Sequence, residues 1–144
     1  MNHKEMLKWY KKHSGLKGRY CVLEFLDGAG PGVVRGRTTY RQTDDFANLR
    51  NAQYQYSPYL FEALLQLTAF YCVAMKMPEK RSMVPMEIGE MRFMRTCRAG
   101  EKITLEARLR AQDNEGSAWD ARGIDDQGRT LMQVQNMRMQ WVSD

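Results

Sequence analysis

The pattern of apolar and polar positions changes its period along the chain. Residues 1–14 carry apolar side chains at helical spacing and lead into a serine-glycine pair, which predicts a short N-terminal helix. From Arg19 to Leu26 the period changes to two, which predicts a strand. The run DGAGPG at residues 27–32 predicts a turn, and residues 33–41 resume the alternation as a second strand.

A long apolar segment begins at the pair Ser57-Pro58. Serine is a favoured N-cap and proline is favoured at the first helical position, so we expect a helix over residues 57–77 that ends before Pro78. Apolar residues surround nearly its whole circumference, so other elements have to cover most of its sides. The segment also carries a glutamate, a glutamine, a threonine and a lysine, and a membrane span needs about 20 mostly apolar residues, so no membrane insertion is expected.

Four further strands are predicted after this helix. Residues 83–95 form the first, and their apolar phase slips near Gly89, which predicts a bulge there. Residues 103–112 alternate strictly between apolar and polar side chains, as in a half-buried strand. The last two strands are expected over residues 118–124 and 130–142, with glycine-containing hairpin loops between the last three strands.

The order of elements is therefore a short helix, two strands, a long apolar helix and four strands. A sheet with one wet face and one face packed on a single helix is the economical arrangement of these elements. The sequence predicts an α+β protein with the hotdog fold, in which an antiparallel sheet wraps around one long central helix. Its 144 residues suit a single domain over residues 1–144, with a second copy closing the far side of the helix.

Composition and charge exclude several classes of protein. Apolar residues make up 43% and charged residues 27% of the chain, as in ordinary folded proteins. Cys21, Cys72 and Cys97 match no zinc motif and the N-terminus lacks a signal-peptide pattern, so we expect a cytoplasmic protein with free thiols, no metal and no cofactor. The net charge of +5 comes without any nucleic-acid-binding motif, which favours solubility or an acidic protein partner over nucleic acid.

Glu62 is the residue most out of keeping with its neighbours, because it lies about one turn into the apolar helix. A carboxyl group in this setting needs a hydrogen bond, and desolvation raises its pKa. Gln66 follows four residues later on the same helix face, where the two side chains can meet. Such a carboxyl group suits general acid–base chemistry on an acyl group, with N–H groups at the helix start polarising a thioester carbonyl. The alternative is that Glu62 only stabilises the start of the helix through its dipole.

The segment SPYLFEALLQ, residues 57–66, resembles the central-helix motif of hotdog acyl-thioester dehydratases. The similarity is closest to the second hotdog of polyketide synthase dehydratase domains, where a proline precedes an acidic residue and a glutamine follows it by four positions. Segments at residues 84–93, 119–122 and 126–131 extend the resemblance over roughly residues 16–139.

The resemblance implies a site and a substrate. Glu62 takes the place of the catalytic acid, and Gln66 that of the amide that orients it. The substrate is implied to be an acyl thioester on acyl carrier protein or coenzyme A, as in polyketide or fatty-acid synthesis, bound by a homodimer or a hotdog heterodimer. The residues expected to bind it are Tyr56, Pro58, Tyr59 and Leu60.

One feature departs from the family pattern. Dehydration also needs a histidine that removes the α-proton of a 3-hydroxyacyl thioester, and this chain has only His3 and His13, both in the predicted N-terminal helix. A partner hotdog could supply the base, or His13 could reach the site across a dimer. The loop before the central helix offers other polar residues, Asn48, Asn51, Tyr54 and Tyr56.

Two further functions stay open at this point. A hotdog thioesterase would use Glu62 to activate water or to attack the carbonyl directly, with no histidine required. A non-catalytic dehydratase-like module would bind acyl chains or a carrier protein within a larger synthase, with the basic N-terminal helix as its docking surface.

Overall fold

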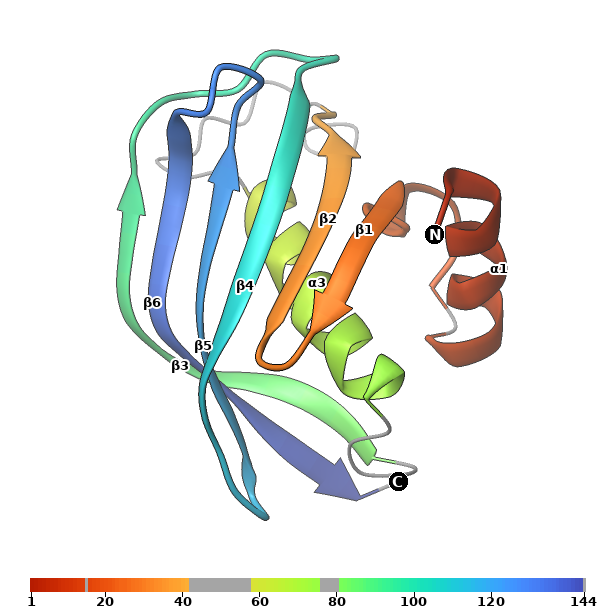
Figure 1. Cartoon of the computed structure of the whole chain (residues 1–144), viewed down its shortest axis with the longest axis vertical. Helices are drawn as coiled ribbons and strands as arrows, with labels where there is room; N and C mark the ends of the chain where they lie inside the picture. Colours follow the sequence, from red (N-terminus) through yellow and green to blue (C-terminus); the bar gives the residue numbers. More distant parts are fainter. Residues whose placement is uncertain (15, 42–57, 76–80, 144) are drawn as a thin grey trace.

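The computed structural model describes residues 1–14, 16–41, 58–75 and 81–143 (Figure 1). In chain order the elements are α1 (His3–His13), η1 (Gly18–Tyr20), β1 (Phe25–Gly30), β2 (Val33–Thr39), α3 (Pro58–Ala74), β3 (Arg81–Phe93), β4 (Lys102–Gln112), β5 (Gly116–Ile124) and β6 (Thr130–Ser143). In the described part of the chain, six strands form one antiparallel sheet in the order β1-β2-β4-β5-β6-β3.

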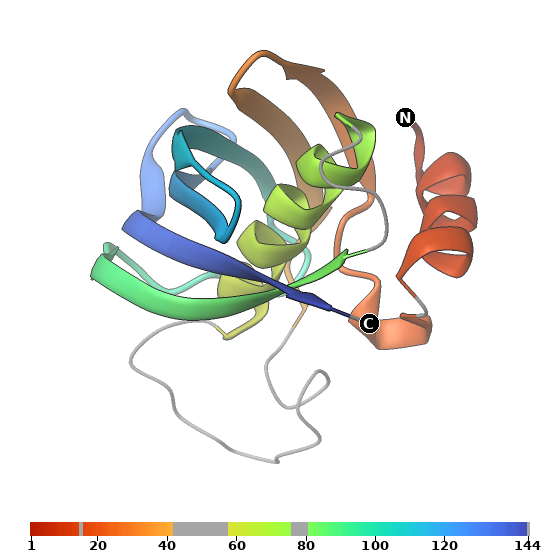
Figure 2. The same ribbon diagram turned by 90° about the horizontal axis from the view of Figure 1, so that it is seen from below.

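The sheet curves around α3, which lies against its concave face (Figure 2). The helix begins at Pro58, whose fixed φ and missing N–H suit the first helical position. On its sheet side, the Tyr71 ring packs edge-on against the fully buried Trp119 of β5, with ring centroids 5.1 Å apart. The predicted α+β architecture, an antiparallel sheet around one long helix, is therefore confirmed. The helix side chains in the core are Tyr59, Leu60, Ala63, Leu64, Leu67, Phe70, Tyr71 and Cys72.

The close approach of α3 to the sheet depends on Gly36 in the middle of β2. A Cβ atom at this position would lie 2.9 Å from the Phe25 carbonyl oxygen and 3.1 Å from Cδ1 of Leu67 on the helix. The first distance is shorter than real Cβ contacts allow, and its partner is backbone. A side chain at position 36 would therefore force the backbone of β1 and the Leu67 side chain of α3 to shift.

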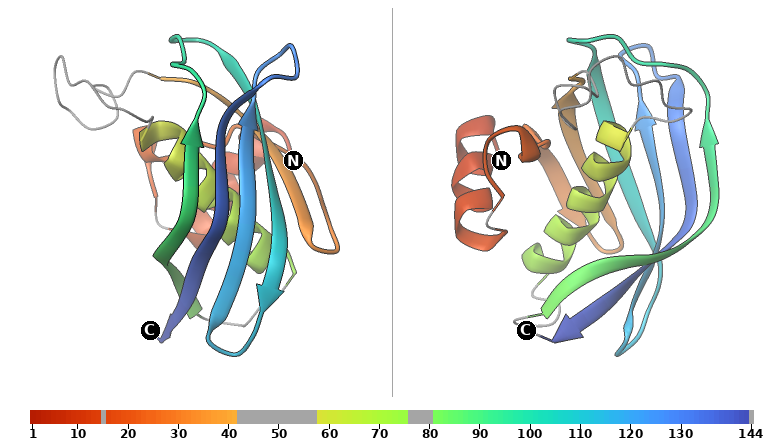
Figure 3. Two further views of the ribbon diagram at one scale, coloured as in Figure 1. Left: turned by 90° about the vertical axis from the view of Figure 1, so that its left-hand side faces the viewer. Right: turned by 180° about the vertical axis from the view of Figure 1, so that it is seen from behind.

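The helix α1 packs against the side of α3, beside β1 at the edge of the sheet (Figure 3). Asn2 and Glu5 form a capping box that fixes its first turn. Its inner face carries Met6 and Tyr10, which are both fully buried. The Trp9 ring packs on Phe70 of α3 at a centroid distance of 4.8 Å. Thus α1 covers part of the central helix that the sheet leaves open.

The predicted strand from Arg19 and the predicted turn at residues 27–32 are both wrong in extent. Val22 and Leu23 are consecutive and both fully buried, which a strand with alternating faces cannot achieve, and β1 begins only at Phe25. It then continues to Gly30, because its small residues pair with β2. The turn is limited to Pro31 and Gly32, and Gly32 has a φ of 73°.

The predicted bulge at Gly89 is also misplaced. The register of β3 against β6 shifts between Pro85 and Glu87, at Met86. Opposite Gly89 the irregular residue is Asn136 of β6, with a φ of 52°. A Cβ atom at Gly89 would lie 3.0 Å from the Asn136 Cβ, so glycine is needed because of the partner strand. The sequence therefore signalled an irregularity whose cause lies in another strand.

Candidate functional site

The candidate site is built on the first half of α3, where Glu62 is half-buried. Burial removes water from its carboxyl group and raises its pKa above the ordinary value. A hydrogen bond from Gln66 has the opposite, smaller effect on the pKa, because it stabilises the ionised form. The group is therefore better able to hold a proton than an exposed glutamate.

Gln66 is the central residue of the hydrogen-bond network around Glu62, and it is only 6% exposed. Its Nε2 donates to Oε1 of Glu62 and to the Tyr20 carbonyl oxygen, both at 2.8 Å. Its Oε1 accepts from the Tyr10 hydroxyl at 2.5 Å and from the Val22 N–H at 3.4 Å. The two side chains on α3 thus meet, as their four-residue spacing predicts, and the amide is held from both ends.

Tyr10 brings the N-terminal helix into this network. Its hydroxyl accepts a hydrogen bond from the Leu23 N–H at 2.9 Å while it donates to Gln66. Burial raises the pKa of the Tyr10 phenol, so the group keeps its proton. The segment from Tyr20 to Leu23, which is irregular instead of a strand, supplies the backbone partners. Sequence reasoning missed Tyr10, and its one signal was a place on the apolar face of α1, four residues after Met6.

The other residues predicted to bind substrate lie at the start of α3. The Tyr59 side chain is buried, and its hydroxyl lies 2.8 Å from Thr38 Oγ1 and donates to the Thr39 carbonyl at 2.9 Å. Leu60 is fully buried and Pro58 is half-buried. Because the side chains of Tyr59 and Leu60 belong to the core, contact with a substrate in this turn would come from the backbone. Four loop candidates, Asn48, Asn51, Tyr54 and Tyr56, lie outside the described residues.

Both histidines of the chain lie on α1 with their rings against other aromatic residues. The His13 ring stacks on Trp9 at a centroid distance of 5.5 Å, and His3 lies 6.4 Å from Phe25. Both are exposed. Among the described residues, the hydrogen-bond network around Glu62 consists of the Gln66 amide, the Tyr10 phenol and backbone groups.

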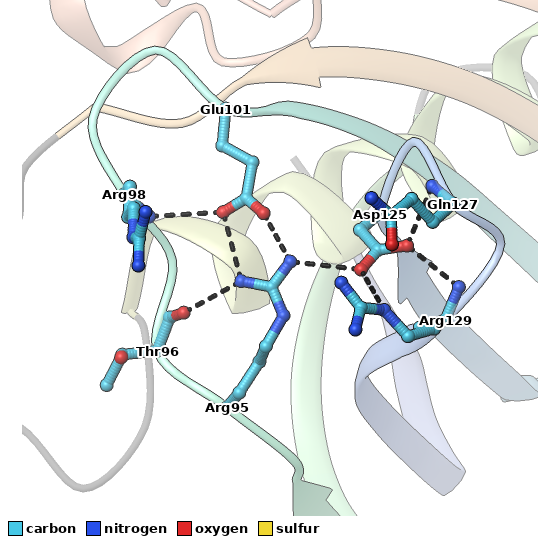
Figure 4. A network of polar contacts seen from close by, with 7 residues as sticks. All are labelled: Arg95, Thr96, Arg98, Glu101, Asp125, Gln127 and Arg129. Carbon is cyan, nitrogen blue, oxygen red and sulfur yellow. Dashed lines mark hydrogen bonds and ion pairs between the residues drawn. The ribbon is translucent and has the colours of Figure 1, made fainter.

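A second polar network, at one end of the sheet, has a different character (Figure 4). The Asp125 side chain is inaccessible to solvent and accepts from the N–H groups of Gln127 and Arg129 and from the guanidinium groups of Arg95 and Arg129. These donors lower the pKa of Asp125 to about 2, despite its burial. Arg95 also binds Glu101, so the network joins the β3–β4 connection to the β5–β6 hairpin. The network holds these two loops together.

Within residues 1–14, 16–41, 58–75 and 81–143, no three histidine, cysteine or acidic side chains are grouped as metal ligands would be. Neither described α-helix has the length and apolar character needed to cross a membrane.

The sheet wrapped around a central helix defines a hotdog-fold protein, and solved structures establish this fold. An inactive mutant of the CurJ dehydratase, in complex with a compound, aligns with a TM-score of 0.73 at 16% identity, over 99% of this chain and 49% of that chain. GphF dehydratase 1 aligns with a TM-score of 0.72 at 19% identity, over 96% and 50%. A hypothetical thioesterase from Streptococcus pneumoniae TIGR4, solved with coenzyme A, gives 0.62 at 13% identity, over 83% and 85%.

The family is shown by the sequence. A family model described as the polyketide synthase dehydratase N-terminal domain matches residues 8–144, so the chain belongs to this family. The predicted relationship to hotdog dehydratases is confirmed. The chain spans about half the length of the two dehydratase structures. The prediction that the chain is closest to the second hotdog stays a prediction, because the matching family model is described as the N-terminal domain. No individual curated protein matches the sequence.

Proposed function

We propose that this protein binds acyl thioesters and, together with a partner that supplies a base, dehydrates 3-hydroxyacyl groups. The observation that carries the proposal is the half-buried Glu62 carboxyl, whose pKa is raised by burial and which is held in place by a hydrogen bond from Gln66. A carboxyl group that holds its proton more strongly than usual can act as a general acid. Family membership supports the same chemistry.

In the proposed reaction the base removes the α-proton, and the electron pair forms the α–β double bond. The bond from the β-carbon to the hydroxyl oxygen breaks, and protonated Glu62 donates its proton to that oxygen. Water and the unsaturated thioester are the products. Gln66 binds Oε1 of Glu62, so Oε2 is the oxygen that would carry the proton to the substrate.

The missing base leads us to propose a hotdog partner, either a second copy or a different hotdog. The strand β3 is at one end of the strand order, and its exposed residues include Met86 and Ile88. An exposed edge strand presents unpaired backbone groups that a second sheet can use. The dehydratase structures are about twice as long as this chain, which leaves room for a second domain of similar size. We propose that the thioester binds at the first turn of α3, from Pro58 to Leu60, and at Tyr56 before it.

The test is an elimination assay with 3-hydroxyacyl thioesters of coenzyme A and of acyl carrier protein, with the unsaturated product and the free thiol measured separately. Replacing Glu62 by Gln should lower the elimination rate at least about a hundredfold, because general acid catalysis contributes about 10²–10⁴. The matched control is Glu24→Gln, another half-buried glutamate, which accepts a hydrogen bond from the Thr39 N–H. An unchanged rate in Glu62→Gln would remove Glu62 from the mechanism.

The same assay tests a second candidate, hydrolysis of the thioester. Similarity in fold to a thioesterase solved with coenzyme A favours it, and Glu62 alone could activate the water. Release of thiol from a saturated acyl thioester, lost in Glu62→Gln, would establish this activity in place of elimination.

Binding of both thioesters without turnover would support the third candidate, a carrier-binding module. Its docking surface would be the exposed lysines on α1, namely Lys4, Lys8, Lys11 and Lys12.

A further inference from the structure

We infer that Tyr10 is a positioning residue for the carboxyl group of Glu62, acting through Gln66 from a separate helix. Its hydroxyl, together with the Val22 N–H, holds Oε1 of the Gln66 amide and so directs Nε2 toward Glu62. The inference rests on the proposed function in that it concerns the same carboxyl group. It adds the N-terminal helix to the site.

The argument starts from the donors and acceptors of the network. The Tyr10 hydroxyl accepts from the Leu23 N–H, so its single proton is directed to Oε1 of Gln66. A primary amide has an acceptor at one end and a donor at the other. Fixing Oε1 at Tyr10 therefore fixes Nε2 at the opposite end, where it donates to Glu62.

With Glu62 ionised, the reversed amide would be mismatched with its partners. It would place Nε2 against the Tyr10 hydroxyl proton and the Val22 N–H, which are both donors. It would also place Oε1 against the Tyr20 carbonyl and the Glu62 carboxylate, which are both acceptors. Tyr10 is 1% exposed and Gln66 is 6% exposed, so solvent cannot compensate for the mismatch. The network therefore has one orientation as long as α1 is docked.

The effect of Tyr10 on the Gln66 amide depends on how α1 packs against the rest of the protein. Met6 is fully buried and Trp9 packs on Phe70 of α3, so α1 is held by apolar contacts on both sides of Tyr10. The titratable groups whose charges act on Tyr10 are Cys21, Tyr59 and Glu62, and burial raises the pKa of the Cys21 thiol. Arg41, the neighbouring cation, reaches the Cys21 carbonyl at 3.5 Å.

The experiment measures the titration of the Glu62 side-chain carboxyl by NMR in the intact protein and in Tyr10→Phe. Loss of the hydroxyl removes the shorter of the two hydrogen bonds to Gln66 Oε1, at 2.5 Å against 3.4 Å for the Val22 N–H. It should therefore loosen the amide, weaken its hydrogen bond to Glu62 and move the titration midpoint of Glu62 to higher pH. The matched control is Tyr71→Phe, since the Tyr71 hydroxyl is also buried and also accepts a backbone N–H, that of Gly32 at 2.8 Å. This control should leave the midpoint of Glu62 unchanged.

A double-mutant comparison shows whether Tyr10 acts through Gln66. Gln66→Met removes the amide and should raise the midpoint of Glu62 by itself, and adding Tyr10→Phe should then change it no further. Equal effects of Tyr10→Phe with and without Gln66 would overturn the inference, as would identical titrations in Tyr10→Phe and Tyr71→Phe. Because the readout needs no turnover, a shifted midpoint in an inactive protein would support the positioning role and refute the proposed dehydration.

A second measurement covers the case in which Tyr10→Phe does not fold. In the unaltered protein, the Gln66 side-chain NH₂ protons should show nuclear Overhauser contacts to the Glu62 side chain. Contacts from these NH₂ protons to the Tyr10 hydroxyl, without contacts to Glu62, would mean that the amide is reversed and would overturn the inference.

Discussion

Glu62 and Asp125 are both carboxyl groups removed from bulk water, yet their pKa values move in opposite directions. Glu62 accepts a hydrogen bond from one neutral amide, and desolvation raises its pKa. Asp125 faces two guanidinium groups and two backbone N–H groups, which lower its pKa to about 2. The comparison shows that the partners, more than burial, decide whether a buried carboxyl is a permanent anion or a group able to exchange a proton.

The difference has a structural origin in the elements that supply the donors. Asp125 lies in a tight hairpin loop whose backbone N–H groups point inward, and Arg95 reaches it from the β3–β4 side (Figure 4). Glu62 lies on a helix, and among the described residues its hydrogen-bond donor is the neutral amide of Gln66, one turn further along. This difference agrees with the proposal that Glu62 transfers a proton, whereas Asp125 joins two loops.

The largest expected effect that tests this comparison is on stability. Asp125→Asn removes the charge that Arg95 and Arg129 bind and should lower the melting temperature by at least about 5 °C. Glu62→Gln removes a half-buried carboxyl that forms no ion pair with the described residues, and it should change the melting temperature by less than about 3 °C. Thermal unfolding followed by circular dichroism gives both values. A larger loss for Glu62→Gln than for Asp125→Asn would contradict the assignment of the two networks.

A smaller effect is expected in the dependence of stability on pH. Because the pKa of Asp125 in the folded state, about 2, lies below its ordinary value, this group stabilises the fold above about pH 4 and loses that contribution as the pH falls toward 2. Glu62 has the opposite sign: its raised pKa means that ionisation costs stability as the pH rises past the ordinary value.

Urea unfolding between pH 2 and pH 7 measures these contributions. Asp125→Asn should flatten the decline in stability below about pH 4 relative to the unaltered protein. Glu62→Gln should gain in stability relative to the unaltered protein as the pH rises from about 4 to 7. Parallel curves for all three proteins would show that neither carboxyl has a shifted pKa.

The smallest effect is expected for the outer cation of the Asp125 network. The Arg129 side chain is 66% exposed, so its ion pair is screened by solvent. Replacing Arg129 by Ala should cost about 1 kcal/mol or less in free energy of unfolding, because its backbone N–H still binds Asp125. Urea titration at neutral pH measures the change. A cost as large as that of Asp125→Asn would mean that this one cation holds the network together.

Much of the fold could be predicted because it depends on local patterns. The alternation over residues 103–112 and the Ser57-Pro58 pair correspond to β4 and to the start of α3. The contact between Glu62 and Gln66 follows from helix geometry alone. These features involve residues that are close in the sequence, so the pattern contains the information needed.

The features that could not be predicted depend on distant residues. The hydrogen bond between Tyr10 and Gln66 joins positions 56 apart, and periodicity shows which face of a helix is buried but not what it meets. The same limit applies to Val22 and Leu23, which are both buried and whose backbone N–H groups bind Gln66 of α3 and Tyr10 of α1. The Arg95–Asp125 pair spans 30 positions and leaves no local trace.

The glycine at the centre of β2 has a consequence for how this protein can vary. At Gly36 a hydrogen atom stands where any other residue has a carbon, so no side chain fits here between β1 and α3. A methyl group there would force the Phe25 carbonyl of β1 and the Leu67 side chain of α3 to shift. Arg35 and Arg37 on the opposite face are exposed and can change without moving the helix. We therefore expect substitutions to accumulate on the exposed face of this strand, at Arg35 and Arg37. On the buried face we expect none at Gly36.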